Sequence, residues 1–349
     1  MNNKRKITKI SELGEFGLID HLTKKIKYSG KDLVMGIGDD TAVYKTGSIC
    51  NLVTTDLLVE GIHFDLIYTP LKHLGYKAVV VNLSDIYAMN GEPKYITISL
   101  AISGKFSVNA IEELYEGILL ACERFNVKLI GGDTTSSLSG LFINITAIGQ
   151  AKEEDITYRS GANKNDLICV SGDLGAAYLG LQLLEREKQL FLSDTEIQPK
   201  LTGFEYIIER QLKPEPRRDI INNLRKSGIK PTSMIDISDG LSSELLHICK
   251  NSGLGCKIFE DKIPVNSQSI EAAEMFRLDT SLAALNGGED YELLFTIPLD
   301  KKEEIEKISD VSIIGYMCDE KEGKYFATRN GVELELKAQG WNPLKEDQE

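Results

Sequence analysis

Long apolar runs are missing from this 349-residue chain, and so is an excess of positive charge. No segment approaches the roughly 20 apolar residues that a membrane-spanning helix needs, and the N-terminal residues show no signal-peptide core. Lys and Arg number 40 against 53 Asp and Glu, which gives a net charge of −13. Nucleic acids and anionic membranes bind basic patches. The composition therefore argues against both partners and predicts a cytoplasmic protein.

Sulfur- and imidazole-based metal patterns are also missing. The six cysteines are scattered without a Cys-x-x-Cys pair, and the four histidines are dispersed. Zinc sites are usually built from such ligands at close spacing. We therefore expect buried free thiols in a reducing compartment and no zinc centre.

The common nucleotide-binding loops are missing as well. The chain has no Gly-x-x-x-x-Gly-Lys-Ser/Thr loop, and its Gly-Ile-Gly-Asp-Asp segment is too short and acidic for a dinucleotide fingerprint. A nucleotide would therefore bind through metal-bridged phosphates and a few basic groups. Arg159 is a candidate counter-charge, and a solvated linker arginine is the alternative.

Alternating strands and helices are what the chain does contain. Hydrophobic residues make up 42% and charged residues 27%, an ordinary globular balance, and the length suggests about two domains. Helical spacing of apolar residues alternates with apolar runs typical of strands, which predicts an α/β or α+β fold. The expected helices are 12–30, 71–89, 108–125, 176–186, 204–212, 217–226 and 241–253. The expected strands are 51–59, 94–102, 128–135, 141–150, 167–172, 232–240, 256–265, 287–297, 311–317 and a hairpin over 324–336 that turns at Asn330-Gly331.

A polar stretch at residues 151–166 divides the chain. It is rich in charge and contains a turn-like Ser-Gly pair. We therefore predict an N-terminal domain over 1–151 and a C-terminal domain over 152–349.

Acidic residues recur in one context, in which Asp stands beside Gly, Ser or Thr near an apolar run. Oxygen ligands without His or Cys select Mg²⁺ or Ca²⁺ over zinc, and Mg²⁺ completes its shell with water and phosphate oxygens. Several such segments predict several Mg²⁺ ions on a polyphosphate. For any single Asp, the alternative to a metal ligand is a residue that caps a helix or forms a turn. Asp39 would then be a turn residue, and Asp239 would be a helix cap. The segments are Gly38-Asp39-Asp40, Thr54-Thr55-Asp56, Asn82-Leu83-Ser84-Asp85, Gly131-Gly132-Asp133-Thr134-Thr135 and Asp236-Ile237-Ser238-Asp239-Gly240.

For two further features, the neighbouring residues allow two interpretations each. The run Asn286-Gly287-Gly288-Glu289-Asp290-Tyr291-Glu292-Leu293 is either a functional loop or a turn with a solvated acidic start. The single tryptophan, Trp341, is either a packing anchor, which we favour, or a platform for a flat ring.

Eight of these segments occur together in a characteristic order. They are GEFGLI, GIGDD, TTDLLVEGIHF, YKAVVVNLSDIYAMNG, LIGGDTT, YRSGA, IDISDGL and GGEDYELLF. From about Glu12 to Trp341 the chain resembles the thiamine-monophosphate kinase family of the aminoimidazole-ribonucleotide-synthetase-like (PurM-like) superfamily. The resemblance implies Mg²⁺-assisted, ATP-dependent phosphorylation of thiamine phosphate to thiamine diphosphate. It also implies a two-domain PurM-like fold, with an N-terminal mixed sheet that pairs with its twin in a homodimer and a C-terminal α/β domain.

The resemblance also carries residue roles to matching positions. The metal ligands would be Asp40, Thr54, Thr55, Asp56, Asp85, Asp133 and Asp236, with Asp239 binding a further ion. The ATP site would comprise Tyr115, Gly132, Asp133, Arg159 and Ser238, and thiamine phosphate would contact His63, Glu289 and Trp341. We expect no acid–base residue, because the acceptor phosphate is already ionised at neutral pH and positioning dominates phosphoryl transfer.

Several alternatives remain at this point. Selenophosphate synthetase belongs to the same superfamily, but a reactive cysteine would be expected before Cys50, the first in this chain. Aminoimidazole ribonucleotide synthetase is less compatible with the GGEDYEL segment. A non-catalytic divalent-cation-binding protein is a different class, although no Asp-x-Asp-x-Asp-Gly loop supports it. A metal-dependent phosphatase would release phosphate without an acceptor.

Overall fold

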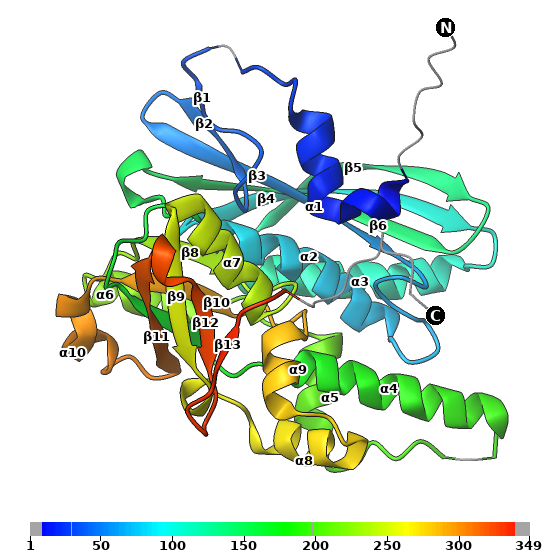
Figure 1. Cartoon of the computed structure of the whole chain (residues 1–349). Coiled ribbons are helices and arrows are strands. Elements are labelled where there is room, and N and C mark those ends of the chain that lie inside the picture. Colours follow the sequence, from blue (N-terminus) through cyan, green and yellow to red (C-terminus); the bar gives the residue numbers. More distant parts are fainter. Residues whose placement is uncertain (1–8, 29, 197, 339–349) are drawn as a thin grey trace, which may run out of the picture.

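The computed structural model describes residues 9–28, 30–196 and 198–338, which form two β-sheets with helices packed between and around them (Figure 1). The helices are α1 Ile10–Thr23, α2 Leu71–Ala88, α3 Val108–Phe125, α4 Ala176–Ser193, α5 Glu205–Leu212, α6 Arg218–Lys226, α7 Leu241–Ser252, α8 Ser267–Phe276, α9 Thr280–Asn286 and α10 Lys302–Ile305. The strands are β1 Leu33–Met35, β2 Ala42–Thr46, β3 Ile49–Val59, β4 Glu92–Ser103, β5 Lys128–Ser137, β6 Leu141–Ala151, β7 Leu167–Ser171, β8 Ser233–Asp236, β9 Leu254–Phe259, β10 Leu293–Ile297, β11 Val311–Asp319, β12 Lys324–Ala327 and β13 Glu333–Glu335.

The first sheet is mixed and has the order β1-β2-β3-β6-β4-β5. The β4–β5 pair is parallel, and the other neighbouring pairs of this sheet are antiparallel. Along β6, burial alternates with a period of two, as expected of a sheet covered on one face. Helices α2 and α3 cover that face (Figure 1), and the opposite face, here called the outer face, exposes Leu57 and Tyr95.

Helix α2 lies between the two sheets and is buried around nearly its whole circumference, the situation that favours apolar residues on every side. Its approach to α3 depends on two glycines. A Cβ at Gly75 would lie 2.0 Å from the Leu114 carbonyl oxygen, and one at Gly117 would lie 1.9 Å from that of Lys72. Any larger residue would push the helices apart. The packing carries Lys77 and Asp85, both on α2, into the interior.

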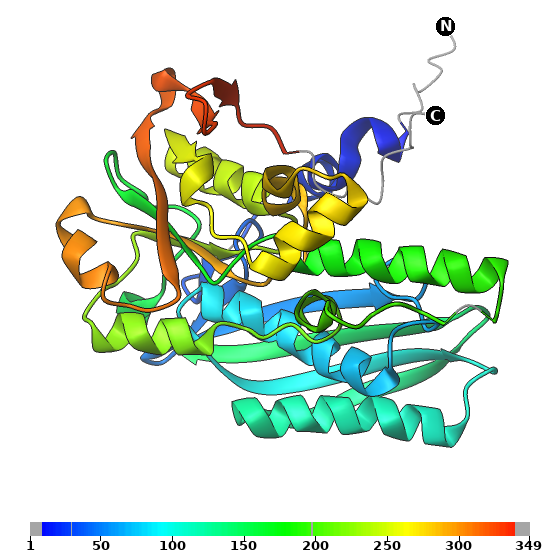
Figure 2. The ribbon, with the colours of Figure 1, turned by 90° about the horizontal axis from the view of Figure 1, so that it is seen from below.

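The second sheet has the order β13-β12-β9-β11-β7-β10-β8, with β12 parallel to β9 and the other pairs antiparallel. Its central strands are buried on both faces, since α7 packs on one side and α6 with α2 on the other. Continuous apolar runs suit such strands. One core cluster includes residues of both sheets, so the two halves share a packed interface. Helices α4, α5, α8 and α9 group beside the second sheet, and Figure 2 shows them from below.

Several expected elements differ from the structure. The helix expected over 176–186 continues to Ser193, and the strand expected over 232–240 ends at Asp236. The helix expected over 12–30 is α1, which ends at Thr23 and is broken at Gly14 (φ 66°), and its Ile19 and Leu22 are exposed. The strand expected over 256–265 ends at Phe259 in a 3₁₀ turn. The strand expected over 287–297 begins only at Leu293. Positive φ angles at Glu289 and Tyr291 break the extended backbone, and such angles are costly for residues other than glycine.

The expectations for the C-terminal hairpin and for the cysteines are confirmed. The β12–β13 hairpin forms around Asn330-Gly331. All six cysteines are buried and free. Across the described ranges, no helix combines the length and the apolar character needed to cross a membrane.

Candidate active site

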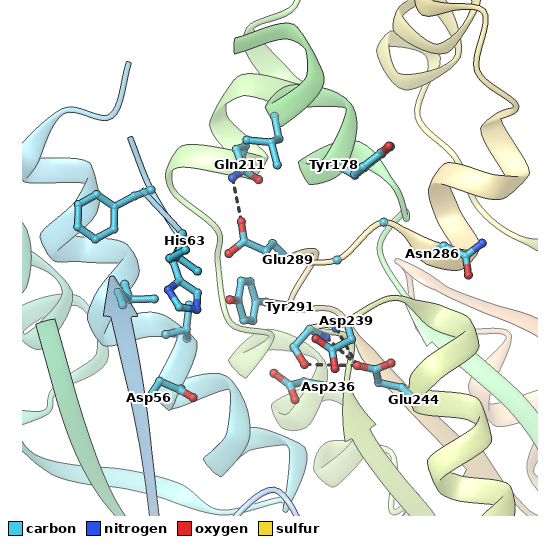
Figure 3. A pocket seen from close by; sticks show the side chains of 18 of the residues that line it. Asp56, His63, Tyr178, Gln211, Asp236, Asp239, Glu244, Asn286, Glu289 and Tyr291 are labelled. Atoms are coloured by element: carbon cyan, nitrogen blue, oxygen red, sulfur yellow. Dashed lines mark hydrogen bonds between the residues drawn. The ribbon is translucent and has the colours of Figure 1, made fainter. Parts of the chain in front are cut away.

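A cavity of about 1320 Å³ lies where the two sheets meet α1, α4, α7 and α9. Its wall includes the ends of β3 and β8, the middle of α2 and the loop before β10. Figure 3 shows Asp56 and His63 on one side and Asp236, Asp239 and Glu244 at the base. The cavity thus gathers side chains from both halves of the chain.

Three carboxylates converge at the base of the cavity. Asp40 follows β1, Asp85 lies in α2, and Asp236 ends β8; one oxygen of each lies within 4.8 Å of the others. Thr54 donates its hydroxyl to Asp85 Oδ2 at 2.5 Å, and Ser84 donates to Asp236 Oδ2 at 2.5 Å. These hydroxyls fix the orientation of two carboxylates and leave other oxygens available.

The carboxylates at this base repel one another in a poorly hydrated place. Burial, followed by the charges of Asp56 and Asp236, raises the pKa of Asp85 well above its ordinary value. Burial and the Asp40 charge raise the pKa of Asp236 to about 7, and burial raises that of Asp56 to about 6. A cation bound among these groups would favour their ionised forms and so offset the rise in pKa.

Arg159 supplies part of the missing positive charge. Its Nη2 and Nε donate to Asp40 Oδ1 at 2.6 and 3.0 Å, and its side chain is 20% exposed. The alternative of a solvated linker arginine is therefore wrong. Asp39 accepts the backbone N–H of Arg159 at 3.2 Å and that of Asp40 at 3.0 Å, and its interpretation as a turn residue stays a prediction. Asp40 Oδ2 is buried, and none of the described residues forms a hydrogen bond with it.

The Ser238-Asp239 turn is held by a residue that the sequence did not single out. Glu244 on α7 accepts the backbone N–H of Asp239 at 2.8 Å and that of Ser238 at 3.3 Å. Burial raises the pKa of Asp239 to about 6, and its carboxylate lies in the cavity (Figure 3). Helix α7 begins after Gly240 without a side-chain cap, so the interpretation of Asp239 as a cap is wrong.

The other end of the cavity holds His63 and Glu289. His63 Nδ1 accepts the Val59 backbone N–H at 3.0 Å, and burial lowers the pKa of this imidazole. Glu289 accepts from Lys77 Nζ at 2.8 Å and from Gln211 Nε2 at 2.8 Å. Lys77 and Gln211 were not predicted. A lysine inside an apolar helical run is the signal that could have drawn attention to the first.

The loop carrying Glu289 is anchored by its other acids. Asp290 is fully buried and accepts the backbone N–H groups of Gly175 and Ala177 at the start of α4. Glu292 is 1% exposed and pairs with Arg210 at 2.8 Å. A solvated acidic start to this segment is therefore wrong, and the buried acids fix the loop beside the cavity.

The structure does not bring every predicted residue to this cavity. Thr55, on the outer face of β3, donates to the Ile145 carbonyl. Asp133 pairs with Ser99, Ser99 with Asn144, and Asn144 with Leu57. Directly paired residues share a face, so Asp133 lies on the outer face, opposite Asp56.

Three other predicted residues are also not among the described residues that line the cavity. Gly132 lies in the exposed edge strand β5, where a Cβ would lie 1.9 Å from the Ile98 carbonyl oxygen. Tyr115 is half-buried on α3 and packs against the core. Trp341 lies outside the described residues. For all of these the predicted roles stay predictions.

Comparison with known proteins adds independent findings. Two family descriptions match the chain: AIR synthase related protein, N-terminal domain, over residues 38–151, and its C-terminal domain over residues 164–327. Thiamine-monophosphate kinase of Bacillus subtilis (strain 168) is 33% identical over 95% of this chain and 100% of its own length. That of Aquifex aeolicus (strain VF5) is 36% identical over 95% and 99%.

Solved structures of similar fold support the same family relationship. A structure described as AaThiL complexed with AMPPCP and TMP has a TM-score of 0.83 and 32% identity, covering 97% of this chain and 99% of the other. Hydrogenase maturation protein HypE in complex with ATP has a TM-score of 0.68 at 18% identity, covering 97% and 99%, which shows a shared fold alone. These similarities confirm the predicted two-domain PurM-like architecture.

Proposed function

The chain belongs to the thiamine-monophosphate kinase family, and we propose that it transfers the γ-phosphoryl group of ATP to thiamine monophosphate, giving thiamine diphosphate and ADP. The observation that carries the proposal is the convergence of Asp40, Asp85 and Asp236 in one cavity. Relatives alike over nearly the whole chain carry this name, and a similar structure is described with an ATP analogue and TMP. The same relatives do not favour selenophosphate synthetase or a non-catalytic cation-binding protein.

The cluster fits divalent cations of the Mg²⁺ type. Its donors are all oxygens, and Asp40 Oδ2 is buried with no partner in the described part of the chain. Burial raises the pKa values of all three carboxyl groups, and repulsion from neighbouring carboxylates raises those of Asp85 and Asp236 further. We propose that Asp40, Asp56, Asp85 and Asp236 hold Mg²⁺, with Thr54 and Asp239 beside them. When bound, Mg²⁺ would neutralise phosphate charge and align the two substrates.

The chain's own residues orient the reaction. Arg159 lies among the carboxylates and can turn toward the polyphosphate, and the Ser238-Asp239 turn lies at the same base. A phosphate oxygen of thiamine monophosphate forms the new bond to the γ-phosphorus while the bond to the ADP oxygen breaks. The acceptor is already ionised, so no side chain needs to remove a proton. Bringing two anions together in the correct geometry is the main task.

We also propose a homodimer formed through the outer face of the first sheet. Leu57 is 51% exposed and Ile130, in the edge strand β5, is 56% exposed. Apolar residues on an uncovered sheet face and an unpaired edge favour association. Asp133 and Thr55 lie on this face, so they could join a nucleotide site only across a subunit contact. Light scattering should give twice the chain mass, and Leu57→Asp should shift it toward the monomer. A fully active monomer would contradict the dimer.

The kinase proposal is tested by incubating the protein with ATP, Mg²⁺ and thiamine monophosphate and separating the products by chromatography. We expect thiamine diphosphate and ADP in equal amounts. Phosphate release without thiamine diphosphate would instead indicate a phosphatase. Binding of Mg²⁺ without turnover would indicate the non-catalytic alternative.

A further inference from the structure

Lys77 is a buried cation at the interface of α2 and α5. Its side chain is 4% exposed, and its Nζ donates to the Gln211 carbonyl oxygen at 2.9 Å and to Glu289 Oε2 at 2.8 Å. Burying an ammonium group is costly unless it is paired. Here the pair ties α2 to the loop before β10 and places the Glu289 carboxylate on the cavity wall.

Gln211 supports the same carboxylate. Its Nε2 donates to Glu289 Oε2 at 2.8 Å, and both residues line the cavity (Figure 3). Gln211 is only 4% exposed, and its buried Oε1 has no hydrogen-bond partner among the residues that the structure describes. A buried acceptor without a donor is destabilising, so this amide oxygen is suited to a ligand that brings a donor.

The two donors also leave part of Glu289 unused. Lys77 and Gln211 both bind Oε2, so neither of these bonds engages Oε1. Both residues line the cavity, and within this network Glu289 Oε1 and the buried Gln211 Oε1 are the two acceptors that neither bond uses. The ion pair with Lys77 uses Oε2 of Glu289. It therefore holds the carboxylate in place and leaves Oε1 able to accept a hydrogen bond.

This inference rests on the proposed function, in which the ligand is thiamine monophosphate. The hydrogen-bond donors of that ligand decide which of its groups can bind Gln211 and Glu289. The thiazolium ring of thiamine monophosphate has no N–H group, and its phosphate is occupied in the reaction. The exocyclic amine of the aminopyrimidine ring offers two N–H donors. We propose that Gln211 and Glu289 accept hydrogen bonds from this amine, and that Lys77 is the positioning residue that holds Glu289 for it. Gln211 is thereby a specificity-determining residue.

The test compares thiamine monophosphate with an analogue in which hydrogen replaces the exocyclic amine. Gln211→Leu should raise KM for thiamine monophosphate about tenfold, the loss of one hydrogen bond, and leave KM for ATP unchanged. For the analogue, KM of Gln211→Leu should stay within about twofold of the unmodified protein. An equal loss with both substrates, or no loss with thiamine monophosphate, would overturn the assignment.

Lys77 is tested by Lys77→Met and Lys77→Arg, with Lys72→Met as the matched control. Lys72 lies on the same helix, but it is exposed and pairs with Glu116 on α3. Lys77→Met should weaken calorimetric binding of thiamine monophosphate at least tenfold, Lys77→Arg should restore part of it, and Lys72→Met should have no effect. Thermal unfolding identifies a variant that fails to fold. If Lys77→Met does not fold, the test with Gln211→Leu decides whether this wall binds the amine.

The two proposals fail in different ways. An unmodified protein that makes no thiamine diphosphate refutes the kinase proposal. An unmodified protein that is active but accepts the analogue as readily as thiamine monophosphate refutes the role of Gln211 alone.

Discussion

Arg159 and Asp40 form a fork in which two guanidinium nitrogens donate to one carboxylate oxygen, at 2.6 and 3.0 Å, while the other oxygen stays buried without a partner. The arrangement keeps a cation inside an acidic cavity before any ligand arrives. It also means that the guanidinium and an incoming metal ion share the same carboxylate.

The first prediction concerns Arg159. Arg159→Met should lower kcat/KM for ATP about 30- to 150-fold, or about 2–3 kcal/mol, because a charge-assisted contact to phosphate is lost. Steady-state kinetics with varied ATP measure it. Arg329→Met is the control, since the Arg329 side chain is 69% exposed and pairs with Glu260, which lies outside the cavity wall. Unchanged ATP kinetics in Arg159→Met would contradict a role in nucleotide binding.

The second prediction separates the two faces of the first sheet. Asp56→Ala removes a carboxylate from the cavity and should cost several kcal/mol of transition-state stabilisation, or at least about 10²-fold in kcat/KM at saturating Mg²⁺. Asp133→Ala should cause a comparable loss only if a second copy completes the site, because Asp133 lies on the outer face. Mixing Asp56→Ala with Asp133→Ala protein should then restore some activity. Near-normal turnover of Asp133→Ala would show that the predicted ligand role is wrong.

The third prediction concerns pH and metal. The pKa of Asp236 rises from an ordinary 3.8 to about 7, and that of Asp56 to about 6. Between pH 3.8 and these raised pKa values, each carboxyl group keeps a proton in the native protein that it has lost in the unfolded chain. The contribution of these two carboxyl groups to the free energy of unfolding is therefore fully present below about pH 4, and it is lost as the pH rises through about 7.

Calorimetry of EDTA-treated protein should thus show Tm falling from about pH 5 to pH 8, and the Tm increase on adding Mg²⁺ should grow over the same interval, because ionised carboxylates bind the cation. Asp236→Asn should flatten both trends, with Asp261→Asn, at an exposed position, as control. A Tm of metal-free protein that rises through pH 7 would refute the explanation.

The fourth prediction concerns the helix pair that positions Lys77 and Asp85. Gly117→Ala would place a methyl group against the Lys72 carbonyl oxygen and should lower the free energy of unfolding by about 1–3 kcal/mol. Gly104→Ala is the matched control, since a Cβ there meets nothing within 4 Å. Denaturant unfolding of both variants measures the difference. Equal stabilities would mean that α2 and α3 can separate without cost.

Local patterns in the sequence predicted much of the fold and part of the site. The apolar spacing of α2 and α3, the alternation in β6 and the Asn330-Gly331 turn depend on near neighbours, so they could be read directly. The acidic segments likewise identified Asp40, Asp85 and Asp236 as candidate ligands. The pattern failed at Glu289 and Tyr291, where positive φ angles are fixed by the buried anchors of the loop and not by its own residues.

Only the tertiary structure decided which of those segments meet. The sequence by itself determined the elements, the oxygen-rich chemistry and the family resemblance, because periodicity and residue type are local properties. Sheet order and helix packing placed Asp133 opposite Asp56 and brought Lys77, Gln211 and Glu289 together from three distant segments. Contacts between such segments depend on how buried surfaces fit one another, and that fit is absent from any short stretch of sequence.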